Sequence, residues 1–351
     1  MRAPDLYFSR TKIYTFFYIW EFFGGSVKKI ISLCVLLCLV LGCLWSQSGQ
    51  LGTGNFVLGV DGAFYPKSDK VLGGNHFAPV TGPYSGIELR VVGTYNYVIP
   101  VPFSDHALVR GNTLTLSPSL EFTPISLAPQ FTMAFSPVAF LIFYAGGKIG
   151  TGWNLDFLGA KGLAIFDEET QKYESVTPFA SYTHQWHLEG LFQFDLAAVV
   201  PGEWNHVVTQ ARYKFLYDGL WNAGGFQKFW RWQGTLEKVS GWQYLSSVVV
   251  GYQMPLVLDM VALQFEFEGY FDKHDFPDWA QDWNPTFMKV GISPVLSFKF
   301  NEKHSLLVQF RFRSRRSFTE EVLPDTNDFY YTYAGREWFF DRIGFSYTMK
   351  L

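Results

Sequence analysis

The chain has 351 residues, of which 19% are aromatic and only 17% are charged, and its formal net charge is −3. Charged residues make up about a quarter of an ordinary soluble domain, so the composition argues against one. The mean hydropathy of +0.05 also excludes a bundle of apolar transmembrane helices. A chain rich in aromatic residues, poor in charge and neutral in hydropathy fits a structure whose residues alternate between lipid and water.

The N-terminal region contains one long apolar run, residues 30–45, which follows Lys28 and Lys29 and precedes small polar residues. Basic residues, a short apolar run and small polar residues are typical of a secretory signal peptide. The run is shorter than the roughly 20 residues that a membrane-spanning helix needs. We therefore predict a signal peptide at residues 27–46, with an N-terminal membrane anchor as the alternative.

Residues 1–26 do not fit a signal peptide, because they place a second aromatic run before the lysines. Bacterial chains can start at a valine codon, and Val27 directly precedes the lysines. Our hypothesis is that residues 1–26 are a mis-assigned upstream extension and that residues 47–351 form the mature, single-domain protein.

All three cysteines, Cys34, Cys38 and Cys43, lie in the signal segment. Cleavage near residue 46 leaves a chain without thiols, which suits export through an oxidising periplasm. Residues 39–43 also resemble a lipoprotein cleavage box, so lipidation of Cys43 is an alternative. Removing residues 1–46 takes away five basic and two acidic residues and leaves a net charge of −6, which argues against a nucleic-acid partner.

From residue 54 onward, apolar and polar residues alternate with period two, which predicts strands. The expected strands are six from residue 207 to the end, one at 188–200, four at 54–64, 84–98, 112–122 and 131–144, and at least one more within the glycine-rich 145–187. An even number of strands keeps both chain termini on one side of the membrane, in the periplasm. We predict an all-β fold, a single transmembrane antiparallel β-barrel of about 12 strands, with 10 or 14 as alternatives.

The connectors between these strands tend to alternate in length. Residues 201–206, 255–259 and 301–305 are short, whereas residues 218–241, 272–285 and 314–335 are long and rich in Gly, Asp, Trp and Tyr. Short turns on one side and long loops on the other are typical of an outer-membrane barrel. A soluble β-sandwich also alternates, but its edge strands and outer faces would carry more charge.

The last strand, with Phe345, Tyr347, Met349 and Leu351 on one face, resembles the C-terminal strand of the bacterial outer-membrane β-barrel superfamily. That strand is an insertion signal read by the barrel-insertion machinery. Leu351 departs from the Phe or Trp usual at the last position. The resemblance implies a protein exported through the periplasm to the bacterial outer membrane and surrounded by outer-membrane lipid. It does not select an activity, since porins, fatty-acid channels and barrel enzymes share the pattern.

Alternation also predicts which charges face the lumen. If Phe265 and Phe267 face lipid, their neighbours on the same strand point inward, and the next two strands follow the same rule. The predicted lumen-facing charges are Glu266, Glu268, Lys289, Lys299, Arg311, Arg313 and Arg315. A hairpin closing through Phe271 and Thr286 would set Glu268 opposite Lys289. Such charges either tune the ion selectivity of a pore or pair with one another in a closed lumen, and the sequence leaves both readings open.

Four tryptophans, Trp230, Trp232, Trp279 and Trp283, lie in the long connectors. Trp230 and Trp232 are expected either to fold inward over the mouth or to contact headgroups, glycans or host ligands. The acidic residues of the second connector do not have the spacing of a calcium loop, so no metal and no cofactor are predicted.

An enzyme is not predicted, because no nucleophile–base–orienter set is recognisable; Ser181, His184 and His187 are close in sequence, but their spacing alone defines no catalytic set. The predicted function is an outer-membrane channel for passive uptake of small solutes, polar or partly hydrophobic. The alternative is a surface-exposed ligand-binding or adhesin-type protein whose long loops bind a host or envelope ligand while the barrel serves as an anchor.

Overall fold

The computed structural model describes residues 52–101, 111–155, 160–170, 172–221, 227–233, 237–319 and 332–351. The predicted signal peptide, the upstream extension and Cys43 lie outside these residues. Within the described residues, no helix has both the length and the apolar character required to span a membrane.

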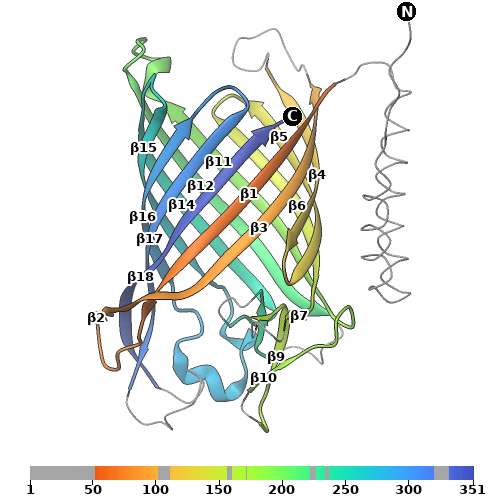
Figure 1. Ribbon diagram of the computed structural model, residues 1–351, viewed down its shortest axis with the longest axis vertical. Coiled ribbons are helices and arrows are strands. Elements are labelled where there is room, and N and C mark those ends of the chain that lie inside the picture. Colours follow the sequence, from red (N-terminus) through yellow and green to blue (C-terminus); the bar gives the residue numbers. More distant parts are fainter. Residues whose placement is uncertain are drawn as a thin grey trace, which may run out of the picture. The chain divides into compact units, whose positions relative to one another are not determined.

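Twelve long antiparallel strands form one closed barrel (Figure 1), as the alternation predicts. Each strand pairs with the next long strand along the chain, and β18 pairs with β1 to complete the ring. The strands are β1 (Thr53–Ser68), β3 (Val80–Pro100), β4 (Thr113–Thr123), β5 (Ser126–Val138), β6 (Leu141–Gly152), β11 (Tyr182–Asp195), β12 (His206–Trp221), β14 (Gly241–Gln253), β15 (Leu258–Tyr270), β16 (Lys289–Lys299), β17 (His304–Phe318) and β18 (Tyr333–Lys350).

The outer face of the barrel is apolar because every second residue of each strand points away from the lumen. Large apolar side chains remain exposed there, among them Ile87, Leu89, Phe122, Phe143, Trp186, Leu188, Phe215, Val250, Leu263 and Phe345. So much exposed apolar surface suits lipid and not water. Closure also gives every long strand a paired neighbour on both sides, so the sheet has no open edge within a bilayer.

The connectors differ in length between the two ends of the barrel. The end that holds the first residues of β1 and the last residues of β18 carries the short connectors at 139–140, 254–257 and 300–303, and the somewhat longer one at 196–205. The opposite end carries the connectors at 69–79, 153–181, 222–240, 271–288 and 319–332. The predicted difference between the two ends is therefore confirmed for the C-terminal half. In the N-terminal half, residues 124–125 are a short exception at the long-connector end and residues 101–112 are a long exception at the end that holds the termini.

The long connectors contain small elements of their own. β9 (Leu163–Asp167) pairs with β10 (Lys172–Ser175) and with β13 (Trp230–Trp232), so two connectors share one three-stranded sheet. The remaining small elements are β2 (His76–Phe77), β7 (Asn154–Leu155), β8 (Ala160–Lys161), η2 (Leu196–Ala198), η3 (Lys273–Asp275) and η4 (Asp278–Trp283).

Two predicted strands are wrong in their limits. The strand expected at 131–144 is two strands, β5 and β6, divided by a turn at Ala139 and Phe140. Both residues of the turn are apolar, and the ring of Phe140 packs against that of Phe192. The sequence of the turn therefore does not differ from that of a strand. The strand expected at 188–200 ends at Asp195, whose side chain accepts a hydrogen bond from the amide of Ala197 and begins η2.

Candidate functional site

The charged side chains of the strands alternate with the exposed apolar ones. On β15, Phe265 pairs with Ile292, whereas Glu266 pairs with Gly291 on the other face. Since the exposed apolar face points outward, we infer that the charged side chains lie on the inner face of the barrel. They form three groups.

The first group joins β15, β16 and β17. Glu268 lies opposite Lys289 in register, as expected from the hairpin, with 3.3 Å between Lys289 Nζ and Glu268 Oε1. Arg313 reaches the same carboxylate from one strand further on. Arg311 Nε lies 3.0 Å from Glu266 Oε2, and both arginine side chains are only 11% exposed. These predicted residues are therefore brought together as a compact set of ion pairs.

Gly291 of β16 has no side chain, which allows Glu266 of β15 and Arg311 of β17 to meet across β16. A Cβ built on Gly291 would lie 3.1 Å from Glu266 Oε2 and 3.7 Å from Arg311 Nε. A larger residue would therefore stand between Glu266 and Arg311, which belong to the strands on either side.

A β-bulge adds charges that the sequence pattern does not reveal. Arg311 pairs with Arg342 and Phe312 pairs with Phe340, so Asp341 is an extra residue on β18. The bulge leaves Asp341 3.8 Å from Arg311 and 3.2 Å from Arg342. Arg342 also donates a 2.7 Å hydrogen bond to the hydroxyl of Tyr65 on β1, which ties this group to the strand that closes the barrel.

The second group lies on β1, β3, β4 and β6. Arg90 ion-pairs with Asp61 at 2.7 Å and with Glu121 at 3.4 Å, and Lys148 ion-pairs with Glu121 at 2.9 Å. Glu121 is almost completely buried, whereas the Arg90 side chain is 46% exposed. The sequence places Arg90 and Glu121 on polar strand faces but does not show that they meet.

The third group lies on β11 and β12. Glu189 is opposite Lys214 in register, and its two oxygens lie 3.2 Å from Arg212 Nε and 3.7 Å from Lys214 Nζ. The carboxylate is 7% exposed and the Arg212 side chain is 47% exposed. One buried acid thus holds two bases, of which Arg212 faces solvent.

Two of the predicted lumen charges stand apart from these groups. Lys299 lies at the end of β16 and ion-pairs with Glu302 of the following turn at 2.9 Å. Arg315 ion-pairs with the buried Glu337, and its guanidinium lies 4.4 Å from the ring centre of Phe339. Lys299 therefore lies at the rim near the termini, and Arg315 lies near the long connectors.

The inner face between the charged groups and the rim near the termini carries small or uncharged polar residues. They include Ser117, Ser119, Thr132, Ser293, Ser297, Gln309, Ser346 and Thr348. Hydroxyl and amide groups of this kind can exchange hydrogen bonds with water or with a polar solute.

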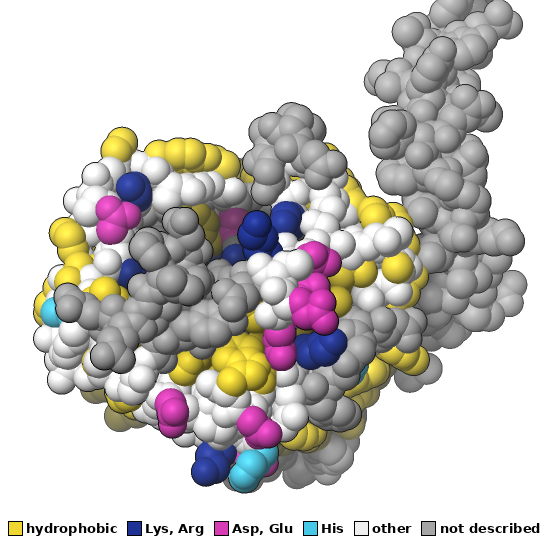
Figure 2. Space-filling model, turned by 90° about the horizontal axis from the view of Figure 1, so that it is seen from below, with side chains coloured by type: hydrophobic (Ala, Val, Ile, Leu, Met, Phe, Trp, Pro, Cys, Tyr) yellow, Lys and Arg dark blue, Asp and Glu magenta, His cyan; other side chains and the backbone are white. Residues whose placement is uncertain are grey.

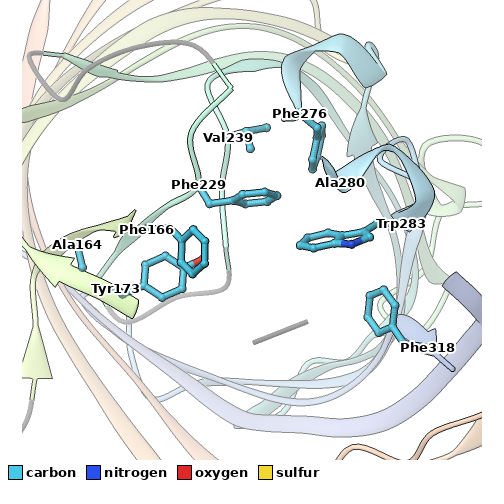
Figure 3. Close-up of a cluster of buried hydrophobic side chains, with 9 residues drawn as sticks. All are labelled: Ala164, Phe166, Tyr173, Phe229, Val239, Phe276, Ala280, Trp283 and Phe318. Atoms are coloured by element: carbon cyan, nitrogen blue, oxygen red, sulfur yellow. The ribbon is translucent and has the colours of Figure 1, made fainter. Parts of the chain in front are cut away.

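The long connectors pack on one another within the ring of strands, as Figure 3 shows. Their buried apolar core consists of Ala164, Phe166, Tyr173, Phe229, Val239, Phe276, Ala280, Trp283 and Phe318. Phe229 stacks near Trp283 at 5.2 Å between ring centres and near Trp279 at 5.5 Å. We call the described residues of these packed connectors, 160–170, 172–175, 227–233, 237–240 and 271–288, the plug. Figure 2 views this end of the barrel, where acidic and basic side chains surround apolar ones.

Polar contacts fasten the plug to the barrel wall. Lys238 Nζ lies 2.7 Å from Asp218 Oδ2, and Asp218 is 1% exposed. Gln233 Nε2 donates to Glu121 at 2.9 Å and to Ser126 at 2.7 Å. Because Gln233 follows β12 while Glu121 is on β4, this connector extends across the mouth and not only along its own strands.

The four loop tryptophans have different environments. Trp230, Trp232 and Trp283 are buried inside the plug, whereas Trp279 is 37% exposed and its indole nitrogen donates to Glu168 at 3.0 Å. Of the two readings of Trp230 and Trp232, inward folding is the one observed. Buried indoles are unavailable to a ligand outside the protein unless the plug unfolds.

The remaining candidates do not assemble into a site. The His184 ring stacks on that of Tyr217 with 5.8 Å between ring centres. His187 is three residues further along β11, so alternation places the rings of His184 and His187 on opposite faces of the strand. The C-terminal residues Phe345, Tyr347 and Met349 pair with β1 and β17; their role as an insertion signal stays a prediction. The described residues contain no group of three or more potential metal ligands.

A closed antiparallel barrel with an apolar outer face and charged side chains on the alternate positions has the architecture of a transmembrane β-barrel. No protein-family model and no curated sequence matches the chain. The chain is similar to solved barrels. An outer-membrane channel from Pseudomonas putida F1 has 11% identity and a TM-score of 0.44, covering 87% of this chain and 99% of that one.

Two further solved structures show the same order of similarity. The β domain of the Bordetella autotransporter BrkA has 10% identity and a TM-score of 0.41, covering 85% of this chain and 99% of that one. The KdgM porin has 8% identity and a TM-score of 0.33, covering 85% and 98%.

Proposed function

We propose that the protein is an outer-membrane channel for passive uptake of small polar solutes, and that the plug narrows its mouth at the cell surface. The observation that carries the proposal is the exposure of Arg90 and Arg212. Both side chains extend from the inner face, yet almost half of each is accessible to solvent. In a barrel filled by its own side chains, such arginines would be buried.

The exposed arginines lie on β3 and β12, which are five strands apart in the ring of twelve and outside the group on β15 to β18. On β15 to β18, Arg311 and Arg313 are tightly paired and largely buried. The proposed solute path therefore runs between β3 and β12, beside charges that water reaches. Charges lining a path of this kind set its ion selectivity, and the uncharged polar residues nearer the termini keep it wettable.

The alternative function, a surface-binding protein anchored by its barrel, has weaker support. It relies on loop aromatics that can reach a ligand, and three of the four tryptophans are buried. Of these four tryptophans only Trp279, next to Glu168, is partly exposed, whereas Phe77 and Phe271 of the long connectors are more exposed than Trp279.

The test is conductance of refolded residues 47–351 in planar bilayers, together with swelling of vesicles in small neutral solutes. We expect discrete conductance steps and swelling. Absence of both, with the barrel shown to be folded by its heat-dependent migration on gels, would overturn the proposal and favour the anchored surface protein.

A matched pair of variants tests whether the current passes through the barrel. Ser119 lies on the inner face of β4 and Leu120, the next residue, is 44% exposed on the outer face. Ser119→Trp should reduce the single-channel conductance, because the indole occupies the lumen. Leu120→Trp should leave it unchanged, because it only adds apolar surface towards lipid.

A further inference from the structure

The geometry points to an oxyanion-binding site on the inner wall at β11–β12, formed by Arg212 and Lys214, for the carboxylate or phosphate group of a small solute. This inference rests on the proposed channel function and names the class of solute that the channel would favour.

The charge balance distinguishes this site from the rest of the inner wall. Arg90 and Lys148 share two carboxylates, Asp61 and Glu121. By contrast, Arg212 and Lys214 have only Glu189 as an ion-pair partner among the described residues.

The group on β15–β18 is also balanced. Its bases Lys289, Arg311, Arg313 and Arg342 face the acids Glu266, Glu268 and Asp341 of the same strands, and Arg342 also ion-pairs with Glu88 of β3 at 3.4 Å. The group at Glu189 is therefore the one of the three with an uncompensated positive charge.

The geometry of Arg212 leaves its binding edge available. Its ion pair with Glu189 uses Nε, and the side chain is nearly half exposed. A guanidinium has five N–H donors in a planar fork, so the Nη groups can still form the paired hydrogen bonds that planar oxyanions accept. The buried carboxylate of Glu189 holds the guanidinium in place, which lowers the entropy lost when a ligand binds.

Neighbouring strands add a phenol and no opposing acid. Tyr144 on β6 lies opposite Glu189 in register, and its hydroxyl can donate to an oxyanion. The His187 ring fills the space over Gly146, where an added Cβ would lie 2.7 Å from it. On the other side of β12, Ser247 lies opposite Arg212. No acid of an adjacent strand therefore stands directly opposite Arg212.

The experiment measures binding independently of conduction. Folded protein in a non-ionic detergent is titrated with inorganic phosphate, followed by line broadening in the phosphorus NMR spectrum, and with carbon-13-labelled acetate, followed in the carbon spectrum. We expect saturable broadening at millimolar concentration with at least one probe. Broadening by phosphate alone identifies a phosphate site, and broadening by acetate alone identifies a carboxylate site.

The variants assign the binding to these residues. Arg212→Gln combined with Lys214→Gln should abolish the broadening. Glu189→Gln should lower the dissociation constant at least threefold, because it removes the competing carboxylate. Lys299→Gln is the control, since Lys299 is equally exposed but pairs one-to-one with Glu302 at the rim, and binding should not change.

Two results would overturn the inference. One is that neither probe broadens with the wild-type protein; the other is that Glu189→Gln and the double variant both bind as the wild type does. If the anions bind but bilayers show no conductance, the site stands and the channel function fails. If bilayers conduct but neither anion binds, the channel stands and the site fails.

Discussion

Glu268 lies opposite Lys289 in the β15–β16 pairing and also ion-pairs with Arg313, which stands one strand further on, at β17. One carboxylate thus serves two bases. Arg313 and its neighbour Arg311 are mostly buried, so neither can exchange its partner for water without a rearrangement of the inner wall. The group behaves as a unit, and removing its bases leaves two carboxylates without compensation.

The combined replacement of Lys289, Arg311 and Arg313 by Gln should therefore destabilise the barrel. Loss of buried ionic partners costs about 3 kcal/mol or more, which should appear as a lower urea midpoint of unfolding in lipid vesicles. Adding Glu266→Gln and Glu268→Gln should restore most of the loss, because the unpaired charges are then gone. An unchanged midpoint in the triple variant would mean that water already solvates the two carboxylates.

The outer face can be tested at Phe265, which pairs with Ile292 away from the charges. Phe265→Arg should destabilise the inserted barrel by about 2–4 kcal/mol if the position is near the bilayer midplane. Gln264→Arg, one residue away on the inner face, should cost far less. Equal losses of folding free energy for the two variants would contradict the assignment of faces.

The barrel could be predicted because alternation is a local property of the sequence, and the requirement for an even number of strands then favoured twelve over eleven. The pairing of Glu268 with Lys289 could also be predicted, because a hairpin fixes its own register. The limits of β5 and β6 could not, because an apolar turn at Ala139 and Phe140 packs on a neighbouring strand and interrupts no pattern.

The rest of the candidate site depends on contacts between residues far apart in the chain. Lys148 meets Glu121 only because β4, β5 and β6 are neighbours in register. Asp341 joins the charged group only because a bulge adds a residue to β18. The hydrogen bond from Gln233 to Glu121 spans 112 positions. No periodicity encodes such contacts, so residue spacing alone could not place them.

One pH effect is expected in the plug. Burial raises the pKa of Asp275 above its usual value, and the nearby Asp272 adds to the rise. A carboxyl group whose pKa is higher in the folded state stabilises the fold less as the pH rises from its unfolded pKa through its folded pKa. At neutral pH the charged form of Asp275 is therefore unfavourable for the folded connector.

Asp275→Asn should accordingly stabilise residues 271–288 at pH 7 and have no effect below the unfolded pKa, about 4. Hydrogen exchange of this connector, compared between wild type and variant across pH 4–8, measures the difference. Asp272→Asn is the control, and it should destabilise the same connector at pH 7. The reason is that hydrogen bonds from His274 lower the pKa of Asp272, so its charged form stabilises the fold. A difference for Asp275→Asn that grows on acidification would contradict the assignment.

The fastening of the plug can be tested at the ion pair between Lys238 and Asp218. Asp218 is buried in the wall, and among the described residues its second hydrogen-bond partner is Gln185, whose amide donates to the same oxygen at 3.1 Å. Lys238→Ala should release residues 227–240, raising their protease sensitivity and the single-channel conductance. Lys228→Ala, an exposed lysine in the same connector, should change neither.

The variant that combines Lys238→Ala with Asp218→Asn separates the two effects of losing the lysine. Lys238→Ala alone leaves a buried carboxylate with only an amide partner, so the barrel itself is weakened as well as the tether. Asp218→Asn removes that charge, and the unfolding midpoint should return towards the wild-type value. The tether is still absent, so the conductance should remain high. If conductance and stability instead recover together, the current in Lys238→Ala comes from a damaged barrel and the plug does not restrict the pore.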